Sequence, residues 1–301
     1  MPTVPTVPAV PTDDAPTPPR PRAPAVTRFP DLEAASAAAA ARVVTLAQAA
    51  LAARGRFDVA LPGGSTPRRL FALLAERYRD ALNWRLVDFW WGDERAVPPE
   101  HPDSNFGLAR ALLLGPLALE AARLHRLRGE DPDLARAAGD CEQELLRRLG
   151  QPPVLDLVIL GLGSDGHTAS WFPHSPAARR SPWDAGASDD PGHGASDDPG
   201  HGASAVPGAR LGSGPWVVAN PVTSPLVGGV ATRLTMTPAL VCNAREVLVL
   251  AAGADKAAAV AAVLHGATDL SRYPAQHLGA AAGKVQWLID DAAASRLGSP
   301  A

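Results

Sequence analysis

Residues 154–170, VLDLVILGLGSDGHTAS, decide how this chain of 301 residues can fold. The first seven residues are almost all apolar, which is typical of a strand covered on both faces in a parallel sheet. Glycines at 161, 163 and 166 then end the apolar run. Ligands of such sheets bind beyond the carboxyl ends of the strands, so we expect chemistry in the loop that follows.

This loop contains the pattern G-x-G-x-x-G, which is also the dinucleotide-binding fingerprint. That fingerprint requires a helix and a second strand after the third glycine. Prolines at 173, 176 and 182 interrupt the segment where the helix would be, which disfavours a nicotinamide oxidoreductase. What remains is Asp165 two residues before His167. A carboxylate that orients an imidazole makes a general base, although a lone loop histidine is more often a surface residue.

Strand and helix patterns alternate on both sides of this loop. Together they predict a single-domain α/β fold, a mostly parallel sheet flanked by helices on both faces. Apolar runs predict strands at 57–61, 86–91, 154–160, 216–219, 247–251 and 285–290. Helical spacing predicts helices at 67–78, 134–149 and 254–265.

Two segments do not fit this alternation. Residues 1–29 are rich in proline and predict a disordered tail, so the catalytic domain is expected over 30–296. Within it, residues 181–214 read as a flexible insertion, because GASDDPGH occurs twice, at 186–193 and 194–201. Asp189, Asp190 and His193 could bind a metal, but a solvated linker is the favoured interpretation.

Composition excludes several classes of protein. The formal net charge of −3 argues against a protein held to nucleic acid by bulk positive charge. No apolar stretch reaches the length of a membrane span, and no secretory signal is visible. Two cysteines, Cys141 and Cys242, cannot make a disulfide framework, which indicates a reducing compartment and a cytoplasmic protein. The histidines and cysteines have no zinc-binding spacing, so we expect no metal.

The loop after the first predicted strand is suited to an anion. It reads LPGGSTP at 61–67. Gly63 and Gly64 let the backbone approach a ligand, and Ser65 or Thr66 can cap the helix that Pro67 opens. Free N–H groups and the helix dipole there attract a phosphate. Taken alone, the segment is better explained as a plain helix start.

Three further loops carry charged residues. Asp93 and Arg95 follow the second predicted strand in WGDER, where they could bind substrate hydroxyls and a phosphate, or form a solvated turn. Arg233 lies in TRLTMTP at 232–238 and reads either as an anion ligand or as a surface arginine. Lys256 in GADK could approach a ligand, but a helix-surface position is favoured.

Taken together, these segments resemble the 6-phosphogluconolactonase family. The matching pieces are LPGGSTP (61–67), NW (83–84), WGDERAVP (91–98), DSN (103–105), GLGSDGHTAS-x-FP (161–173), RLTMT (233–237), GADK (253–256), YPAQHL (273–278) and WLIDxAA (287–293). The resemblance implies a modified Rossmann-type sheet, like that of glucosamine-6-phosphate deaminases. It also implies that the δ-lactone of 6-phosphogluconate is hydrolysed without a metal or other cofactor.

The resemblance further assigns roles to matching residues. His167 is the implied general base, with Asp165 its neighbour in the site. The implied phosphate-binding residues are Gly64, Ser65, Thr66, Arg95 and Arg233. The expected partner is a sugar-phosphate lactone, with neither nucleic acid nor membrane, in a monomer or weak homo-oligomer.

The sequence departs from the family pattern at one point, and two relatives remain as alternatives. The family usually has Leu-Phe-Pro-Gly where residues 171–174 read WFPH. Glucosamine-6-phosphate deaminases carry a glutamate before the matching proline, where this chain has Phe172, which disfavours amino-sugar chemistry. Sugar-phosphate-sensing domains of repressors carry an N-terminal helix-turn-helix, where this chain has its proline-rich tail.

Overall fold

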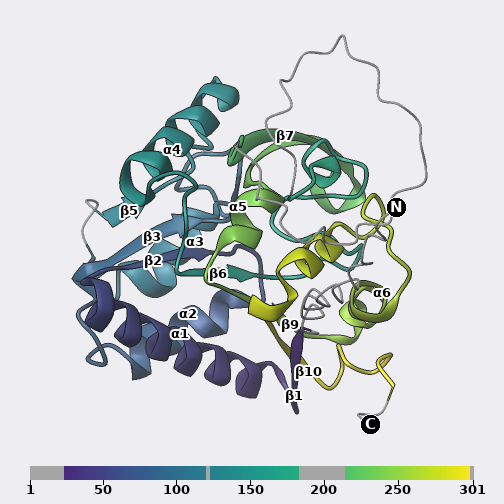
Figure 1. The fold of residues 1–301 in the computed structure, drawn as a ribbon, viewed down its shortest axis with the longest axis horizontal. Coiled ribbons are helices and arrows are strands. Elements are labelled where there is room, and N and C mark those ends of the chain that lie inside the picture. The colour runs from purple at the N-terminus through teal and green to yellow at the C-terminus, as the bar shows by residue number, and fades with distance from the viewer. Residues whose placement is uncertain (1–23, 120–122, 183–213, 299–301) are drawn as a thin grey trace, which may run out of the picture.

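The computed structural model describes residues 24–119, 123–182 and 214–298. They fold into an α/β domain around a mostly parallel sheet, which confirms the predicted fold class (Figure 1). Within these residues the main sheet has seven strands in the order β1-β10-β9-β6-β2-β3-β5, and every neighbouring pair is parallel. The strands are β1 (Ala25–Phe29), β2 (Phe57–Leu61), β3 (Val87–Trp91), β5 (Leu124–His125), β6 (Leu157–Leu160), β9 (Glu246–Ala251) and β10 (Val285–Asp290).

Helices cover both faces of this sheet. Figure 1 shows α1 and α2 on one face and α4 and α5 on the other. The α-helices are α1 (Leu32–Arg54), α2 (Pro67–Arg77), α3 (Asn105–Ala109), α4 (Leu134–Leu149), α5 (Pro238–Asn243) and α6 (Ala257–His265). The 3₁₀-helices are η1 (Trp84–Leu86), η4 (Ala177–Arg179), η5 (Pro225–Val227), η6 (Ala254–Lys256) and η7 (Pro274–Lys284). One π-helical turn, η2 (Arg110–Leu114), follows α3.

Helix α1 shows why these segments are helical and where the core lies. Asp31 caps its start by accepting a hydrogen bond from the N–H of Ala34, and Gly55 ends it at a φ of 71°. Its buried residues recur mainly every three or four positions, and the helix packs on strands β9 and β10. In the described part of the chain, α1 alone is long and apolar enough to cross a membrane, by length and composition only.

A second, antiparallel sheet lies beside the main one and holds one of the predicted strands. It consists of β4 (Asp93–Arg95), β8 (Gly229–Met236) and β7 (Val217–Ser224), in the order β4-β8-β7. The strand predicted at 216–219 lies here, because the chain turns back at η5 and pairs with itself as a hairpin. Met236 donates a backbone hydrogen bond to Gly92 at 2.8 Å, which joins this sheet to the end of β3.

The boundary predicted at residue 29 is too late. Residues 25–29 form β1, which pairs with β10 at the edge of the main sheet. Much of this edge strand is exposed, so its composition does not distinguish it from the tail. The rest of the predicted tail, residues 1–23, and most of the predicted insertion, including both GASDDPGH copies, lie outside the described residues.

Candidate active site

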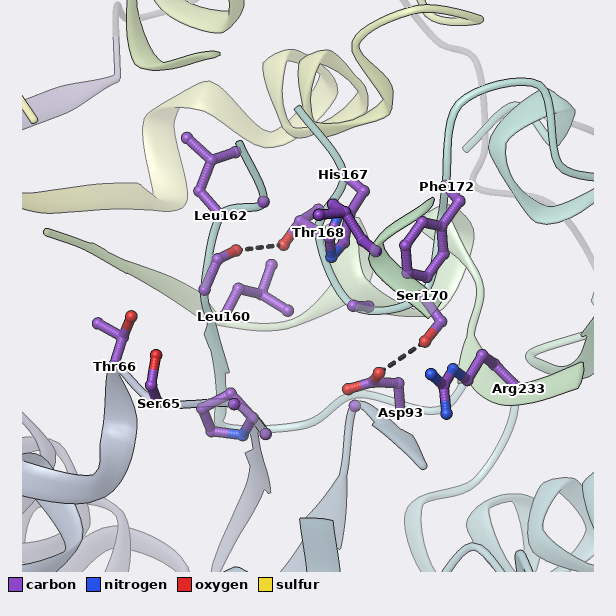
Figure 2. A pocket seen from close by; sticks show the side chains of 18 of the residues that line it. Ser65, Thr66, Asp93, Leu160, Leu162, His167, Thr168, Ser170, Phe172 and Arg233 are labelled. Atoms are coloured by element: carbon purple, nitrogen blue, oxygen red, sulfur yellow. Dashed lines mark hydrogen bonds between the residues drawn. The ribbon is translucent and has the colours of Figure 1, made fainter. Parts of the chain in front are cut away.

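A cleft of about 210 Å³ opens at the carboxyl ends of β2, β3 and β6. The loops predicted to carry chemistry all reach it, because these three strands are parallel and adjacent. In Figure 2, Ser65 and Thr66 lie on one side of the cleft, Asp93 and Arg233 on the other, and His167 above them. Of the predicted site residues, eight line the cleft: Gly63, Gly64, Ser65, Thr66, Asp93, Arg95, His167 and Arg233.

The ninth predicted residue, Asp165, lies behind His167. Its Oδ1 is 2.5 Å from Nδ1 of His167 and also accepts the backbone N–H of His167 at 3.1 Å. Burial alone would raise the pKa of Asp165, but the hydrogen bond and charge of His167 outweigh burial and lower it. Asp165 is therefore a carboxylate near neutral pH. A neutral imidazole beside it carries its proton on Nδ1, which leaves Nε2 with a free lone pair.

Gly163 provides the space for this pair. A Cβ atom at residue 163 would lie 2.0 Å from Nδ1 of His167 and 2.6 Å from Oδ1 of Asp165. The N–H of Gly163 also donates to the carbonyl of His167 at 2.8 Å, which closes the turn. The glycine pattern that imitates a dinucleotide fingerprint therefore serves to pack the loop against its own imidazole.

The loop before α2 leaves backbone and hydroxyl groups at the cleft. Thr66 begins the helix, but its side chain makes no capping hydrogen bond, contrary to the capping role considered for Ser65 or Thr66. Gly64 has a φ of 87°, and a Cβ at Gly63 would lie 1.7 Å from Oδ1 of Asn105. The loop that leads into α2 therefore borders the cleft, with the positive dipole end of the helix directly behind it.

Arg95 and Arg233 face each other across the β4–β8 pair. Arg95 donates to the backbone carbonyl of Asp103, whereas Arg233 makes no hydrogen bond or ion pair with any residue in the described ranges. Burial lowers the pKa of Arg233, and the positive charge of Arg95 lowers it further. Like charges opposite each other are unfavourable in a sheet, so this arrangement favours a bound anion.

Asp93 is held by protein groups on both carboxylate oxygens. Oδ2 accepts a hydrogen bond from the hydroxyl of Ser170 at 2.6 Å, and Oδ1 accepts one from Nδ2 of Asn105 at 3.2 Å. Asp93 thereby joins the loop after β3 to the loop after β6. Asp93 lines the cleft, as predicted, and its remaining lone pairs can accept hydrogen bonds there.

The sequence interpretation missed one residue of this region. Glu94, buried in the core, accepts the backbone N–H groups of Asn105 and Phe106, each at 2.8 Å, and so caps α3. No local pattern indicates this, because donor and acceptor are distant in sequence. For Lys256 the sequence favoured a helix-surface position over an approach to a ligand, but Lys256 lines the cleft, with Nζ 3.1 Å from Asp255.

The departure from the family pattern at His174 preserves the turn. His174 has a φ of 62°, in the left-handed region that glycine adopts freely. Histidine is among the residues that tolerate this region better than most. The N–H of His174 donates to the carbonyl of Ser271 at 2.9 Å, which fixes the turn in place.

In the ranges 24–119, 123–182 and 214–298, no group of three or more histidine, cysteine, aspartate or glutamate side chains is placed to hold a metal ion. The aspartates and histidines of the repeated GASDDPGH segments lie outside these ranges.

Comparisons with known proteins agree with this architecture. The family model described as glucosamine-6-phosphate isomerases/6-phosphogluconolactonase matches residues 30–197 and 194–287. The 6-phosphogluconolactonase of Synechocystis is 34% identical over 259 residues, covering 85% of this chain and 90% of the relative. The solved 6-phosphogluconolactonase of Trypanosoma brucei superposes with a TM-score of 0.73 at 27% identity, covering 91% of this chain and 99% of that one.

The same fold occurs in an amino-sugar enzyme. A monomeric glucosamine-6-phosphate deaminase superposes with a TM-score of 0.66 at 20% identity, covering 90% of this chain and 99% of that one, a likeness that concerns the fold alone. The family match spans most of the chain, and the relatives are covered almost end to end. This chain therefore belongs to the glucosamine-6-phosphate isomerase/6-phosphogluconolactonase family.

Proposed function

We propose that this protein hydrolyses 6-phospho-D-glucono-1,5-lactone to 6-phosphogluconate, the second step of the oxidative pentose phosphate pathway. The relatives named as 6-phosphogluconolactonases, aligned over most of the chain, support this activity. The observation that carries it is the placement of His167 in the same cleft as Arg95 and Arg233. A base and a pair of cations across one cavity suit an ester that carries a phosphate.

The phosphate is bound away from the reacting carbon. Arg95 and Arg233 bind it by charge-assisted hydrogen bonds, and its negative charge relieves their mutual repulsion. The loop before α2, from Gly63 to Thr66, offers N–H and hydroxyl donors to the same end of the ligand. Asp93 accepts hydrogen bonds from sugar hydroxyls. Binding at these groups orients the lactone before any bond changes.

His167 then acts as the general base. Nε2, which has no hydrogen-bond partner among the described residues, accepts a proton from water while Asp165 holds Nδ1. The hydroxide equivalent attacks the lactone carbonyl carbon, and backbone N–H groups of the glycine-rich turns stabilise the tetrahedral oxyanion. The bond to the ring oxygen breaks as His167 returns its proton to that oxygen. The products are a carboxylic acid, which ionises, and a hydroxyl group.

A kinetic assay tests this assignment. Initial rates on freshly made 6-phosphogluconolactone, corrected for spontaneous opening, are compared for the wild type and His167→Ala. We expect kcat to fall about 10²–10⁴-fold with a modest change in KM, as for loss of a general base. Full activity in His167→Ala would overturn the role of His167. Ammonia release from glucosamine 6-phosphate by the wild type would instead indicate a deaminase.

We further propose a cytoplasmic enzyme that is a monomer or a weak homo-oligomer. The support is compositional, because two buried cysteines without a disulfide suit a reducing compartment. Cell fractionation and sedimentation at several protein concentrations test these two points. A stable oligomer at the lowest protein concentration would contradict the proposed monomer or weak homo-oligomer.

A further inference from the structure

Phe172 covers one face of the imidazole of His167. The two rings stack with centroids 4.1 Å apart and an angle of 21° between their planes. Figure 2 shows the Phe172 ring beside His167 at the same end of the cleft. Phe172 is 5% exposed and lines the cleft, so this contact is inside the site. His167 is therefore held at two places, by Asp165 at Nδ1 and by Phe172 on its face.

The segment that carries Phe172 is itself anchored on both sides. Asn220 on β7 is completely buried, and its Nδ2 donates to the carbonyl of Ser170 at 2.7 Å. Its Oδ1 accepts the backbone N–H of Ala177 at 3.0 Å. Next to Phe172, the indole of Trp171 donates to the carbonyl of Met236 at 2.7 Å. The phenyl ring is thus presented by a segment that cannot easily move away from His167.

The two restraints on His167 act on different motions. The hydrogen bond at Nδ1 ties the imidazole to the side chain of Asp165, but the two side chains can still move together about their own side-chain bonds. The phenyl ring stacked on the imidazole face opposes that movement, which keeps Nε2 directed at the cleft. An aromatic face also attracts a cation, so it favours the imidazolium that forms when His167 takes a proton.

We propose that Phe172 is a positioning residue for proton transfer by His167. This inference rests on the proposed function, in which His167 is the base. Misplacement of a reacting group by about 1 Å can cost about 10²-fold in rate, and loss of one of two restraints should cost less. We therefore expect Phe172→Leu to lower kcat about tenfold while KM stays within about threefold. Phe172→Tyr, which keeps the stacked ring, should retain at least about half of the wild-type kcat.

A matched control separates positioning from general loss of packing. Phe57 is a buried phenylalanine at the amino end of β2, the end opposite to the cleft. Phe57→Leu should lower the thermal midpoint as Phe172→Leu does, yet keep the wild-type kcat per folded molecule. If Phe172→Leu does not fold, Phe172→Met, whose unbranched side chain adapts to the shape of the space, replaces it in every comparison. An unchanged kcat in the variant that folds would overturn the proposal.

A double variant tests whether Phe172 acts through His167. In the His167→Ala background, Phe172→Leu should cause no further fall in kcat, because its effect requires the imidazole. Additive losses would show that Phe172 acts on the substrate or the fold, and would overturn the proposal. If His167→Ala alone is fully active, the proposed function fails. If His167→Ala is impaired and Phe172→Leu is not, only the inference about Phe172 fails.

Discussion

The substitution Asp165→Asn tests the electrostatic basis of the proposed base. Asp165 accepts a hydrogen bond from Nδ1 of His167 at 2.5 Å, and its lowered pKa keeps it negatively charged. Asparagine has the same shape but no charge. When His167 takes a proton, the wild type gains a carboxylate–imidazolium pair, which the variant lacks. The substitution should therefore affect the transition state more than substrate binding.

The size of the expected fall in kcat follows from the hydrogen bond at Nδ1 of His167. A hydrogen bond to a charged group contributes about 1.5–3 kcal/mol, and a neutral one about 0.5–1.5 kcal/mol. The side chain of Asp165 is 27% exposed, so solvent weakens this difference only partly. A loss of about 1.4 kcal/mol lowers kcat about tenfold. If the asparagine amide instead donates to Nδ1, Nε2 carries the proton and cannot accept one, and the loss can approach about 10⁴-fold.

Two measurements check this prediction. Initial rates on fresh lactone give kcat and KM, with Asp291→Asn, an exposed carboxylate after β10, as the charge-matched control. Nitrogen-15 NMR of His167 shows which ring nitrogen carries the proton in each protein. We expect kcat to fall between about tenfold and 10⁴-fold, with the larger loss accompanied by a proton on Nε2. A kcat within twofold of the wild type would refute the reasoning.

Three further predictions concern the neighbouring structure. Gly163→Ala places a methyl group 2.0 Å from Nδ1 of His167, so we expect kcat to fall by about 10²-fold or more. The control Gly139→Ala, at an exposed position of α4, should instead stabilise the fold by about 0.5–1 kcal/mol in urea denaturation. In steady-state kinetics, Arg233→Ala should raise KM about 10- to 100-fold with kcat nearly unchanged, because a charge-assisted hydrogen bond to phosphate is lost. A fall in kcat alone would contradict this prediction. Burial would raise the pKa of Asp88, but its hydrogen bond with a histidine and two arginine charges lower it. Asp88→Asn should therefore destabilise the protein by about 3 kcal/mol at neutral pH. This difference in the free energy of unfolding should shrink below about pH 4, because the wild-type carboxyl becomes protonated there. Denaturant titrations that give a difference independent of pH would contradict the prediction.

The order of the parallel strands explains why much of the cleft could be predicted. The apolar strands ending at Leu61, Trp91 and Leu160 are visible in the sequence, and each is followed by a polar, glycine-containing loop. In a parallel sheet those ends meet at one edge, so the loops converge whatever the details of the helices. The pairing of Asp165 with His167 is also local, since the two residues are only two positions apart on a tight turn.

Other contacts of the cleft could not be predicted from local patterns. The strands β4 and β8 carry only short or mixed apolar patterns, which are typical of loops. Their antiparallel pairing sets Arg95 opposite Arg233, and both the repulsion between the two charges and the proposed binding of an anion depend on that register. Similarly, Asn220 anchors the segment after His167 although nothing near it in sequence marks it.

The sequence by itself determined the alternation of strands and helices and the edge at which the polar loops converge, and it indicated His167 as the candidate base. These properties depend on hydrophobic periodicity and on residues close together along the chain. Only the tertiary structure decided which cations share the cleft, that Phe172 stacks on His167, and that residues 25–29 join the sheet. The physical reason is that the pairs Arg95–Arg233 and β1–β10 join segments distant in sequence, whose register is fixed by packing and backbone pairing. Phe172 is close to His167 in sequence, but its segment is held in place by the distant residues Asn220 and Met236.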